Sequence, residues 1–339
     1  MVKVGIIGLG GMGNMHLGMY QANKDAEVVA IADIDPAKLK PGDSALEINI
    51  GAGGGKIDPA KMKLYSKPGD LLKDPNVELV DITLPTFLHA EYMIKALKAG
   101  KHVLCEKPMA MNHDECRRVL KAHDASNVKL MIAQCIRFWP EYVHLQEAID
   151  SGRLGRLLSL SLWRGGALPQ WSWDQWLQDH KRSGGAILDL HVHDVDYVNY
   201  VLGMPKAVCS TGAMGGTGGY DAVDTVYIYE DGKMSIHGGA NMILPTGFGF
   251  EMKYAASFQD GCIWYSSSRT PSLTEVRGKE VTHPQVPATT GYAEEIAYML
   301  RCVAEDEEPA ACPPESSAET IRLAMAEIES VREGKLVEL

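Results

Sequence analysis

The stretch VKVGIIGLGGMG, residues 2–13, decides the fold of the first part of this 339-residue chain. Its apolar run Val2–Ile7 predicts a buried β-strand. The following Gly8-Leu9-Gly10-Gly11-Met12-Gly13 satisfies the pattern G-x-G-x-x-G and opens a helix. A second apolar run ends at Asp33, twenty residues beyond Gly13. A strand, a glycine-rich turn, a helix and a second strand that ends in an acid are typical of a dinucleotide-binding βαβ unit.

The three glycines of the pattern each have a mechanical role. Gly8 permits the tight turn, Gly10 lets the backbone approach a pyrophosphate, and Gly13 lets the helix pack against the strand. The helix N-terminus presents free N–H groups and the positive end of its dipole to the phosphates. The pattern is therefore interpreted as a cofactor-binding turn rather than a structural one.

Asp33 indicates which cofactor is bound. A carboxylate there accepts hydrogen bonds from the adenosine ribose and repels a 2′-phosphate, and Ile34 and Asp35 bring no cation to neutralise one. Lys38 is the nearest cation and is interpreted as a solvated side chain. The sequence predicts NAD, favoured over NADP.

The rest of the first part alternates short apolar runs with helical patterns. Strands are expected over 27–32, 79–83, 102–105 and 129–135, and helices over 11–21, 89–99 and 113–123. This alternation predicts a doubly wound parallel sheet, the Rossmann architecture. The segment 40–63 is rich in Gly, Pro and Lys, lacks periodicity, and is expected to form an exposed loop.

The second part has a different texture. Helices are expected over 142–151, 185–202, 292–304 and 316–332, and strands over 157–163, 225–229, 234–238, 248–254 and 262–265. Successive strands with glycine punctuation predict an open, mostly antiparallel sheet flanked by helices. We expect a Rossmann NAD-binding domain over 1–125 and an α+β domain for substrate binding and oligomerisation over 126–339, whose last helix packs back on the first domain.

Composition limits the class of protein. The chain is 45% hydrophobic and 23% charged, with a net charge of −11, so an acidic surface argues against nucleic-acid binding. No apolar run is long enough for a membrane span, and the first residues lack the pattern of an export signal. The seven cysteines are widely scattered without zinc or redox spacing. A cytoplasmic enzyme with a small-molecule substrate is expected.

Two further motifs carry chemistry. Lys107 follows a strand and precedes Pro108, which places it at a carboxyl end of the parallel sheet, where open α/β folds bind ligands. An ammonium there can stabilise a substrate alkoxide. Asp189 and His193 stand four apart on an expected helix, so the carboxylate can fix the tautomer of an imidazole that acts as general base.

Three spaced motifs give the chain its resemblance to the glucose–fructose oxidoreductase / inositol dehydrogenase / MocA family. The first runs from Val80-Asp81-Ile82-Thr83-Leu84-Pro85 and His89 to Glu106-Lys107-Pro108; the second is Ser183-Gly184-Gly185 through Asp189 to His193-Asp194-Val195-Asp196; the third is Arg137-Phe138 with Pro140. The likeness extends over nearly the whole chain.

The resemblance implies a sugar, polyol or inositol dehydrogenase with Lys107, Asp189 and His193 as catalytic group, assembled as a homodimer or homotetramer. The residues expected to bind cofactor are Gly8, Gly10, Gly11, Met12, Gly13, Asp33, Ile34, Thr83, Leu84, Pro85, His89, Glu106, Lys107, Arg137 and Trp176. The residues expected to bind substrate are Lys107, Trp163, Arg164, Asp189, His193 and Tyr292. Aromatic faces suit the C–H faces of sugars, and Arg164 suits hydroxyl or carboxylate groups.

Several alternatives stay open at this point. His191 departs from the small residue common in relatives and is interpreted as packed; with His193 it does not predict a metal site, because residues two apart on a helix point apart. One alternative function is a redox-neutral glycosidase that oxidises its substrate only transiently. Another is a non-catalytic NAD- or sugar-sensing protein, which the presence of Lys107, Asp189 and His193 disfavours.

Overall fold

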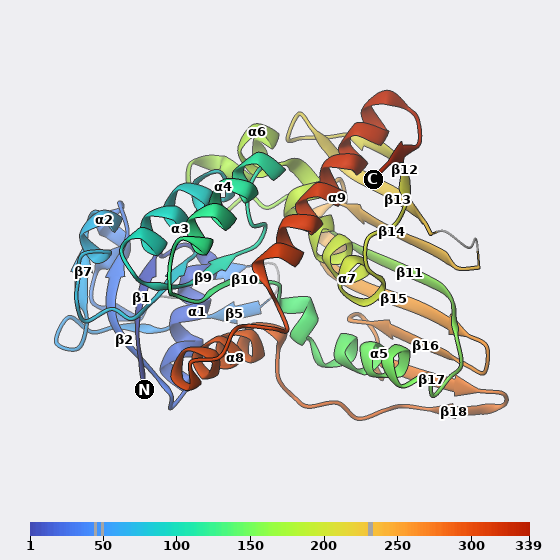
Figure 1. The fold of residues 1–339 in the computed structure, drawn as a ribbon, viewed down its shortest axis with the longest axis horizontal. Helices are drawn as coiled ribbons and strands as arrows, with labels where there is room; N and C mark the ends of the chain where they lie inside the picture. The colour runs from blue at the N-terminus through green and yellow to red at the C-terminus, as the bar shows by residue number, and fades with distance from the viewer. Residues whose placement is uncertain (44–45, 49–50, 230–232) are drawn as a thin grey trace. The chain divides into compact units, whose positions relative to one another are not determined.

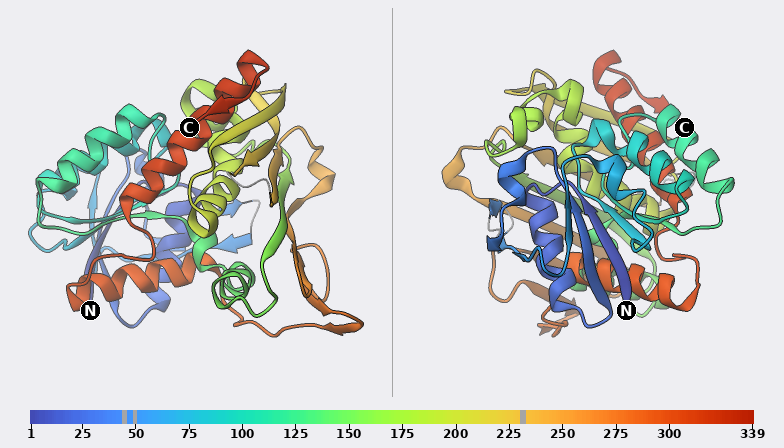
Figure 2. Two further views of the ribbon diagram at one scale, coloured as in Figure 1. Left: turned by 45° about the vertical axis from the view of Figure 1, so that its right-hand side comes forward. Right: turned by 90° about the vertical axis from the view of Figure 1, so that its left-hand side faces the viewer.

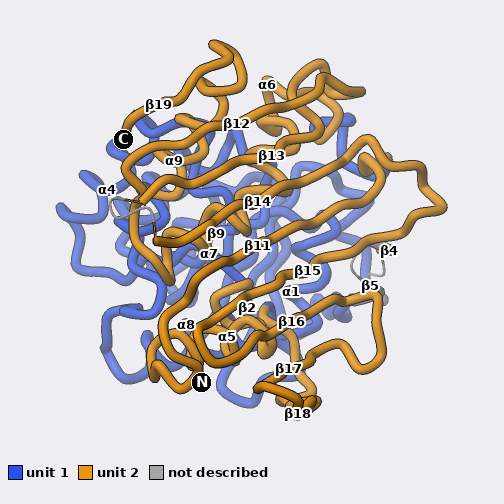
Figure 3. The backbone as a smooth tube through the Cα atoms, turned by 90° about the vertical axis from the view of Figure 1, so that its right-hand side faces the viewer, with its two compact units in different colours: residues 1–135, 171–176, 292–318 blue, residues 136–170, 177–291, 319–339 orange. Residues whose placement is uncertain are grey.

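The computed structural model describes residues 1–43, 46–48, 51–229 and 233–339. They fall into two compact units. Unit 1 comprises residues 1–135, 171–176 and 292–318, and unit 2 comprises 136–170, 177–291 and 319–339 (Figure 3). Each unit has its own sheet.

The sheet of unit 1 has six parallel strands in the order β10-β9-β8-β1-β2-β7. This is the doubly wound order in which the chain reverses direction beside the first strand, here between β1 and β8. Ligands of such sheets bind at this reversal, outside the carboxyl ends of the strands. The strands are β1 (Val2–Ile7), β2 (Ala26–Ala32), β7 (Lys63–Tyr65), β8 (Leu79–Ile82), β9 (His102–Glu106) and β10 (Leu130–Ala133).

Helices cover both faces of this parallel sheet, as its apolar strands require. Helices α1 and α8 lie on one face and α3 and α4 on the other (Figures 1 and 2). All four residues of β8 and all four of β10 are buried. The bounds are α1 (Gly11–Ala22), α2 (Pro68–Leu71), α3 (His89–Lys98), α4 (His113–Asp124) and α8 (Gly291–Glu305).

The segment 40–63 corrects the expectation of an exposed loop. Its described parts form two small antiparallel ladders, and Lys63 begins β7 at the edge of the main sheet. The backbone of Lys56 exchanges two hydrogen bonds, of 2.7 and 2.8 Å, with the Gln21 side chain of α1. Strands of two or three residues carry too little periodicity to be recognised in a sequence. They are β3 (Gly42–Asp43), β4 (Leu46–Ile48), β5 (Gly51–Gly53) and β6 (Lys56–Ile57).

The sheet of unit 2 has nine strands in the order β18-β17-β16-β15-β11-β14-β13-β12-β19. Every neighbouring pair is antiparallel except β11 with β14, which are parallel. The strands are β11 (Leu157–Gly166), β12 (Ala207–Met214), β13 (Tyr220–Ile228), β14 (Ser235–Asn241), β15 (Phe250–Phe258), β16 (Cys262–Ser266), β17 (Leu273–Arg277), β18 (Glu280–Thr282) and β19 (Val337–Glu338).

One face of this sheet is covered by helices (Figure 1). Along β13 the buried residues Val223, Thr225 and Tyr227 alternate with the exposed Asp224 and Val226, which is typical of a sheet with one free face. Figure 3 looks onto that free face. The helices are α5 (Pro140–Ser151), α6 (His180–Ser183), α7 (Val192–Leu202) and α9 (Pro314–Glu333), which begins in unit 1. Among the described residues, every helix is too short or too polar to traverse a bilayer.

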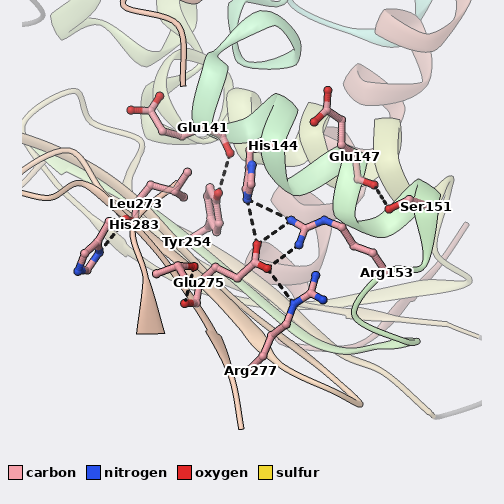
Figure 4. A network of polar contacts seen from close by, with 11 residues as sticks. Glu141, His144, Glu147, Ser151, Arg153, Tyr254, Leu273, Glu275, Arg277 and His283 are labelled. Carbon is pink, nitrogen blue, oxygen red and sulfur yellow. Dashed lines mark hydrogen bonds and ion pairs between the residues drawn. The ribbon is translucent and has the colours of Figure 1, made fainter. Parts of the chain in front are cut away.

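A polar network ties α5 to β17 in unit 2 (Figure 4). The Glu275 carboxylate accepts hydrogen bonds of 2.5 and 2.7 Å from the Arg153 guanidinium, and the His144 ring nitrogen Nε2 lies 3.1 Å from its Oε2. Arg277 donates a further bond of 3.2 Å. The Arg153 guanidinium, with His144 and Arg277, lowers the pKa of Glu275 to about 2.

Glu275→Gln is expected to lower the free energy of unfolding by about 1–2 kcal/mol at pH 7. Hydrogen bonds to charged groups contribute about 1.5–3 kcal/mol, and solvent screens the partly exposed Arg153. Because the pKa of Glu275 is lower in the folded protein, its contribution is complete above about pH 5 and is lost as the pH falls toward 2. Denaturant unfolding at pH 7 and pH 3 measures it. Glu280→Gln, at an exposed position, is the control. If the free energies of unfolding of Glu275→Gln and the parent protein differ by the same amount at pH 7 and pH 3, the prediction is contradicted.

Candidate active site

The glycine-rich turn of unit 1 is built as its sequence predicts. Gly8 has φ +96°, in the left-handed region that favours glycine. A Cβ atom on Gly13 would lie 2.0 Å from the Gly8 carbonyl oxygen and 2.7 Å from the Thr83 hydroxyl, so only glycine fits there. Thr83 in turn donates a hydrogen bond of 2.5 Å to the Gly8 carbonyl. The end of β8 thus braces the turn that follows β1.

The outer side of the turn is open. A Cβ atom on Gly10 would meet no other atom within 4 Å. Gly10 is also the N-cap of α1, whose first amides, of Gly11, Met12 and Gly13, have no intrahelical acceptor in an α-helix. Asn14, a residue that the sequence reasoning missed, closes the turn by donating to the carbonyls of Leu9 and Gly10 at 3.1 and 2.9 Å. Open space beside free amides suits a phosphate group.

Asp33 lies at the end of β2 and is 6% exposed. Its carboxylate accepts hydrogen bonds from the Leu9 amide at 2.7 Å and the Asp35 amide at 2.8 Å. The Lys38 ammonium lies 3.6 Å from Asp33 Oδ2, so Lys38 is paired rather than merely solvated as expected. Ile34 beside it is exposed.

Lys107 follows β9 directly, at the same carboxyl edge of the sheet. Its backbone amide donates to Glu106 Oε2 at 3.0 Å. The following carbonyl, of Pro108, lies 2.8 Å from Nδ1 of His89, and Nε2 of His89 lies 2.7 Å from the carbonyl of Leu84. His89 is buried and joins the segment after β8, which includes Pro85, to the segment after β9.

The other half of the predicted catalytic group lies in unit 2. The helix expected over 185–202 is helical from residue 185, widens into a π-helical turn over Ile187–His191 and continues as α7. Asp189 lies in the π-helical turn and is half-buried, and His193 lies in α7 and is 7% exposed. The wider i→i+5 turn alters the plain four-residue spacing on which the sequence argument relied, and such turns occur often at functional sites.

His191 is packed, as interpreted from the sequence. It is fully buried, with Nε2 3.3 Å from Glu327 and 3.3 Å from the Tyr227 hydroxyl. Among the described residues, two groups are spaced so that they could hold a metal ion, and neither includes His191 or His193.

Two arginines expected at the site form buried ion pairs within unit 2. Arg164, on β11, donates bonds of 2.8 and 2.6 Å to Asp194, and Arg137 donates bonds of 2.8 and 2.7 Å to Asp196. The guanidinium of Arg137 also lies 4.7 Å from the ring centre of Tyr200. The sequence motif contains Asp194 and Asp196 but does not identify their partners. Two acids within an apolar helix indicate that each is paired with a buried cation. These two ion pairs anchor α7 to β11 and to the segment that carries Arg137.

The aromatic candidates divide between the units. Trp163 lies on β11 in unit 2, with its ring 6.2 Å from that of Phe248 and 4.3 Å from the Lys253 ammonium. Trp176 belongs to unit 1, at the end of its 171–176 segment, and is half-buried. Tyr292 lies in the first turn of α8 in unit 1, where burial raises the pKa of its phenol.

Two family models match the chain. Residues 2–134 match the oxidoreductase family with an NAD-binding Rossmann fold, and residues 142–247 match the C-terminal domain of the same Gfo/Idh/MocA family. The chain belongs to the Gfo/Idh/MocA oxidoreductase family. The likeness stated from the motifs and the fold expected from the strand pattern are confirmed.

Relatives match this oxidoreductase over its full length. Inositol 2-dehydrogenase of Rhizobium meliloti is 27% identical, with 100% of this chain and 99% of the relative aligned. Myo-inositol 2-dehydrogenase of Thermotoga maritima is 26% identical, covering 100% and 98%. A levoglucosan dehydrogenase solved with NADH and levoglucosan superposes with a TM-score of 0.83 at 21% identity, covering 99% of each chain, and supports the fold.

The residues of unit 1 fit the NAD that this family binds. Gly10 leaves space for the pyrophosphate beside the first amides of α1. The Asp33 carboxylate accepts a hydrogen bond from the Leu9 amide of the same turn. In Rossmann domains an acid at this position hydrogen-bonds the adenosine ribose. The predicted cofactor is thus confirmed as NAD.

Proposed function

We propose that this oxidoreductase is an NAD(H)-dependent dehydrogenase of a sugar, polyol or inositol, with Lys107, Asp189 and His193 as its catalytic group. The observation that carries the proposal is the position of Lys107. Lys107 follows β9 directly, at the carboxyl ends of the parallel strands, where the glycine-rich turn and Asp33 also lie. A lysine there fits the family chemistry, in which an ammonium steadies a substrate oxygen.

Each catalytic residue has one task in this proposal. The Lys107 ammonium hydrogen-bonds the substrate hydroxyl and stabilises the alkoxide. The His193 imidazole accepts the hydroxyl proton, and the Asp189 carboxylate fixes its tautomer and raises its basicity. When bound, NAD supplies the hydride acceptor or donor at the nicotinamide. The buried pair Arg164–Asp194 holds the helix that carries His193.

The relatives support the proposed substrate class. Trp163 is kept as a substrate contact on the resemblance alone, since it alternates with Arg164 along β11 and so lies on the face of the sheet turned away from α7. The full-length relatives are named for inositol, and the levoglucosan dehydrogenase was solved with a sugar derivative. We include Tyr292 as a substrate contact, and Trp176 and Arg137 as cofactor contacts, on the resemblance alone.

Reduced-nicotinamide formation with NAD⁺ across inositols, sugars and sugar acids tests the function. We expect NADH to form with one of these substrate classes and not with simple alcohols. Tight NAD binding without net reduction on any of them would contradict the dehydrogenase. Cleavage of glycosides without net reduction would favour the redox-neutral glycosidase. The absence of any turnover would favour the non-catalytic sensing protein.

Asp33→Ala is expected to weaken NAD(H) binding about tenfold, because it removes a charge-assisted hydrogen bond to the ribose. The ratio of the affinities for NAD(H) and NADP(H) should fall accordingly. Since Asp33 also holds the Leu9 amide, Asp33→Asn is the matched variant that keeps one acceptor oxygen. Titration of protein fluorescence with NADH and NADPH measures both affinities. Unchanged NADH affinity in both variants would remove the ribose role.

We also propose that the free face of the nine-stranded sheet pairs with a second copy of the chain. Val226 is 52% exposed and Trp264 is 38% exposed in strands of this sheet, and exposed apolar side chains on a free sheet face favour an interface with another chain. Light scattering of the purified protein distinguishes a dimer or tetramer from a monomer, which would contradict the assignment. The cytoplasmic location stays a prediction.

A further inference from the structure

Unit 1 contains a buried charged cluster that the proposed mechanism does not use. It joins α1 (His16), β8 (Asp81) and the end of β9 (Glu106), and His16 and Asp81 are both fully buried. Nδ1 of His16 is hydrogen-bonded to Asp81 Oδ2 at 2.8 Å, and its Nε2 forms an ion-pair contact of 3.2 Å with Glu106 Oε1. Burying such charges costs several kcal/mol per ion unless they are paired, so the cluster requires an explanation.

The contacts favour a doubly protonated His16. Its Nδ1 is hydrogen-bonded to Asp81, and its Nε2 faces the second carboxylate, Glu106, in an ion-pair contact rather than a hydrogen bond. Burial alone would lower the pKa of His16, but the charges and hydrogen bonds of Asp81 and Glu106 raise that pKa well above its usual value. Burial raises the pKa of Glu106, but the contacts of His16, together with the charges of Lys107 and His89, lower it below its usual value. A protonated His16 therefore balances one of the two negative charges of Asp81 and Glu106 in the interior.

A third acid completes the surroundings. Glu295, from α8, is fully buried, and neither of its carboxylate oxygens has a hydrogen-bond partner among the described residues. Burial and the neighbouring charge of Glu106 raise the pKa of Glu295 well above its usual range. The other groups electrostatically coupled to the cluster are Tyr20, His89, Cys105, Lys107 and Tyr292.

The cluster ends on the backbone of the proposed catalytic lysine. While Glu106 Oε1 faces His16, Glu106 Oε2 accepts the hydrogen bond from the Lys107 amide. We propose that His16 is a positioning residue: by pairing with Asp81 and Glu106 it fixes the carboxylate that holds Lys107 in place. The link from His16 to the Lys107 amide stands on the geometry alone. Its effect on the rate rests on the proposed function of Lys107.

The link is tested first without any substrate. In protein labelled with [¹⁵N]lysine, the Lys107 amide is assigned as the resonance that Lys107→Arg removes. We expect it at low proton field, since it donates to a carboxylate. His16→Asn and Glu106→Gln should both move it to higher field. Leu17→Ala, which truncates a buried neighbour on α1, controls for loss of packing and should leave it in place. A folded His16→Asn protein with an unchanged Lys107 amide would overturn the inference.

The effect on turnover is tested with a double-mutant cycle on the panel substrate that reacts fastest. His16→Asn should lower kcat about 10²-fold, the loss that a small misplacement of a catalytic group produces. If His16 acts through Lys107, the double variant with Lys107→Met should be no slower than Lys107→Met alone. Losses that multiply would mean that His16 acts by another route and would overturn the inference.

Two further outcomes keep this inference separate from the proposed function. If Lys107→Met itself retains the parent kcat, the proposed function of Lys107 fails, whereas the resonance of its amide still tests the link. His16, Glu106 and Glu295 also offer ligand atoms within 4.8 Å of one another. One divalent metal ion per chain, found by elemental analysis of the purified protein and lost in His16→Asn, would overturn the ion-pair reading of the cluster.

Discussion

The His193→Ala variant is expected to lose about 10²–10⁴-fold in kcat, which is the contribution of a well-placed general base. His193 is 7% exposed on α7, and the glycine-rich turn and Asp33 lie in unit 1, so NAD binding should persist. Steady-state rates with the reacting panel substrate, together with an NADH titration, measure the two effects separately.

His237→Ala is the matched control for His193→Ala. His237 is an exposed histidine on β14 of the same unit, so its replacement should leave kcat unchanged. A His193→Ala enzyme with a near-normal rate would end the general-base assignment. Partial rescue by added imidazole would support it.

Gly13→Ala is expected to abolish NAD binding and to lower the free energy of unfolding by about 3 kcal/mol, the upper range for overpacking. Its Cβ would lie 2.0 Å from the Gly8 carbonyl oxygen, which is a backbone atom and cannot rotate away. Thermal unfolding and NADH titration measure both effects. An unchanged melting temperature would contradict this geometry of the turn.

Gly10→Ala separates binding from folding. No atom lies within 4 Å of the added methyl group, and Gly10 has φ −79°, which alanine adopts freely. The variant should therefore melt with the parent protein yet bind NADH at least about tenfold more weakly, because the methyl group occupies the approach of the pyrophosphate. If Gly10→Ala binds NADH as tightly as the parent protein does, the pyrophosphate does not lie beside Gly10.

Local patterns explain which parts of the fold were predictable. The turn from Gly8 to Gly13 depends on residues adjacent in sequence, and the sequence predicted both its shape and the cofactor. Strands such as β8 and helices such as α4 show full periods and were predicted within a few residues of their observed bounds. The ladders within 42–57 are too short to show a period, and the π-helical turn before α7 depends on tertiary packing rather than on any repeat.

Long-range pairing explains what was missed at the candidate site. Nothing near Arg164 in the sequence reveals that Asp194 is its partner, thirty residues away. His16 occupies an apolar helix position, and its carboxylate partners come from two different strands. Such pairs become visible only once the strands have a spatial order. The site residues and the boundary near 125 therefore stay predictions, and the variants above test the site residues.

The parallel pairing of β11 with β14 has a consequence for how the chain folds. Strands β12–β13–β14 and β15–β16–β17–β18 are two meanders that can form by closing short hairpins, whereas β11 precedes both and joins them as a seam between β14 and β15. This seam has high contact order, since the helices α6 and α7 and the strands β12 and β13 all lie between β11 and its parallel partner, and contacts of that kind form slowly. The same connection between β11 and β14 carries Asp189 and His193. We therefore expect α7, the helix that carries the proposed general base, to assemble late in folding, which pulsed hydrogen exchange would test through late protection of β11.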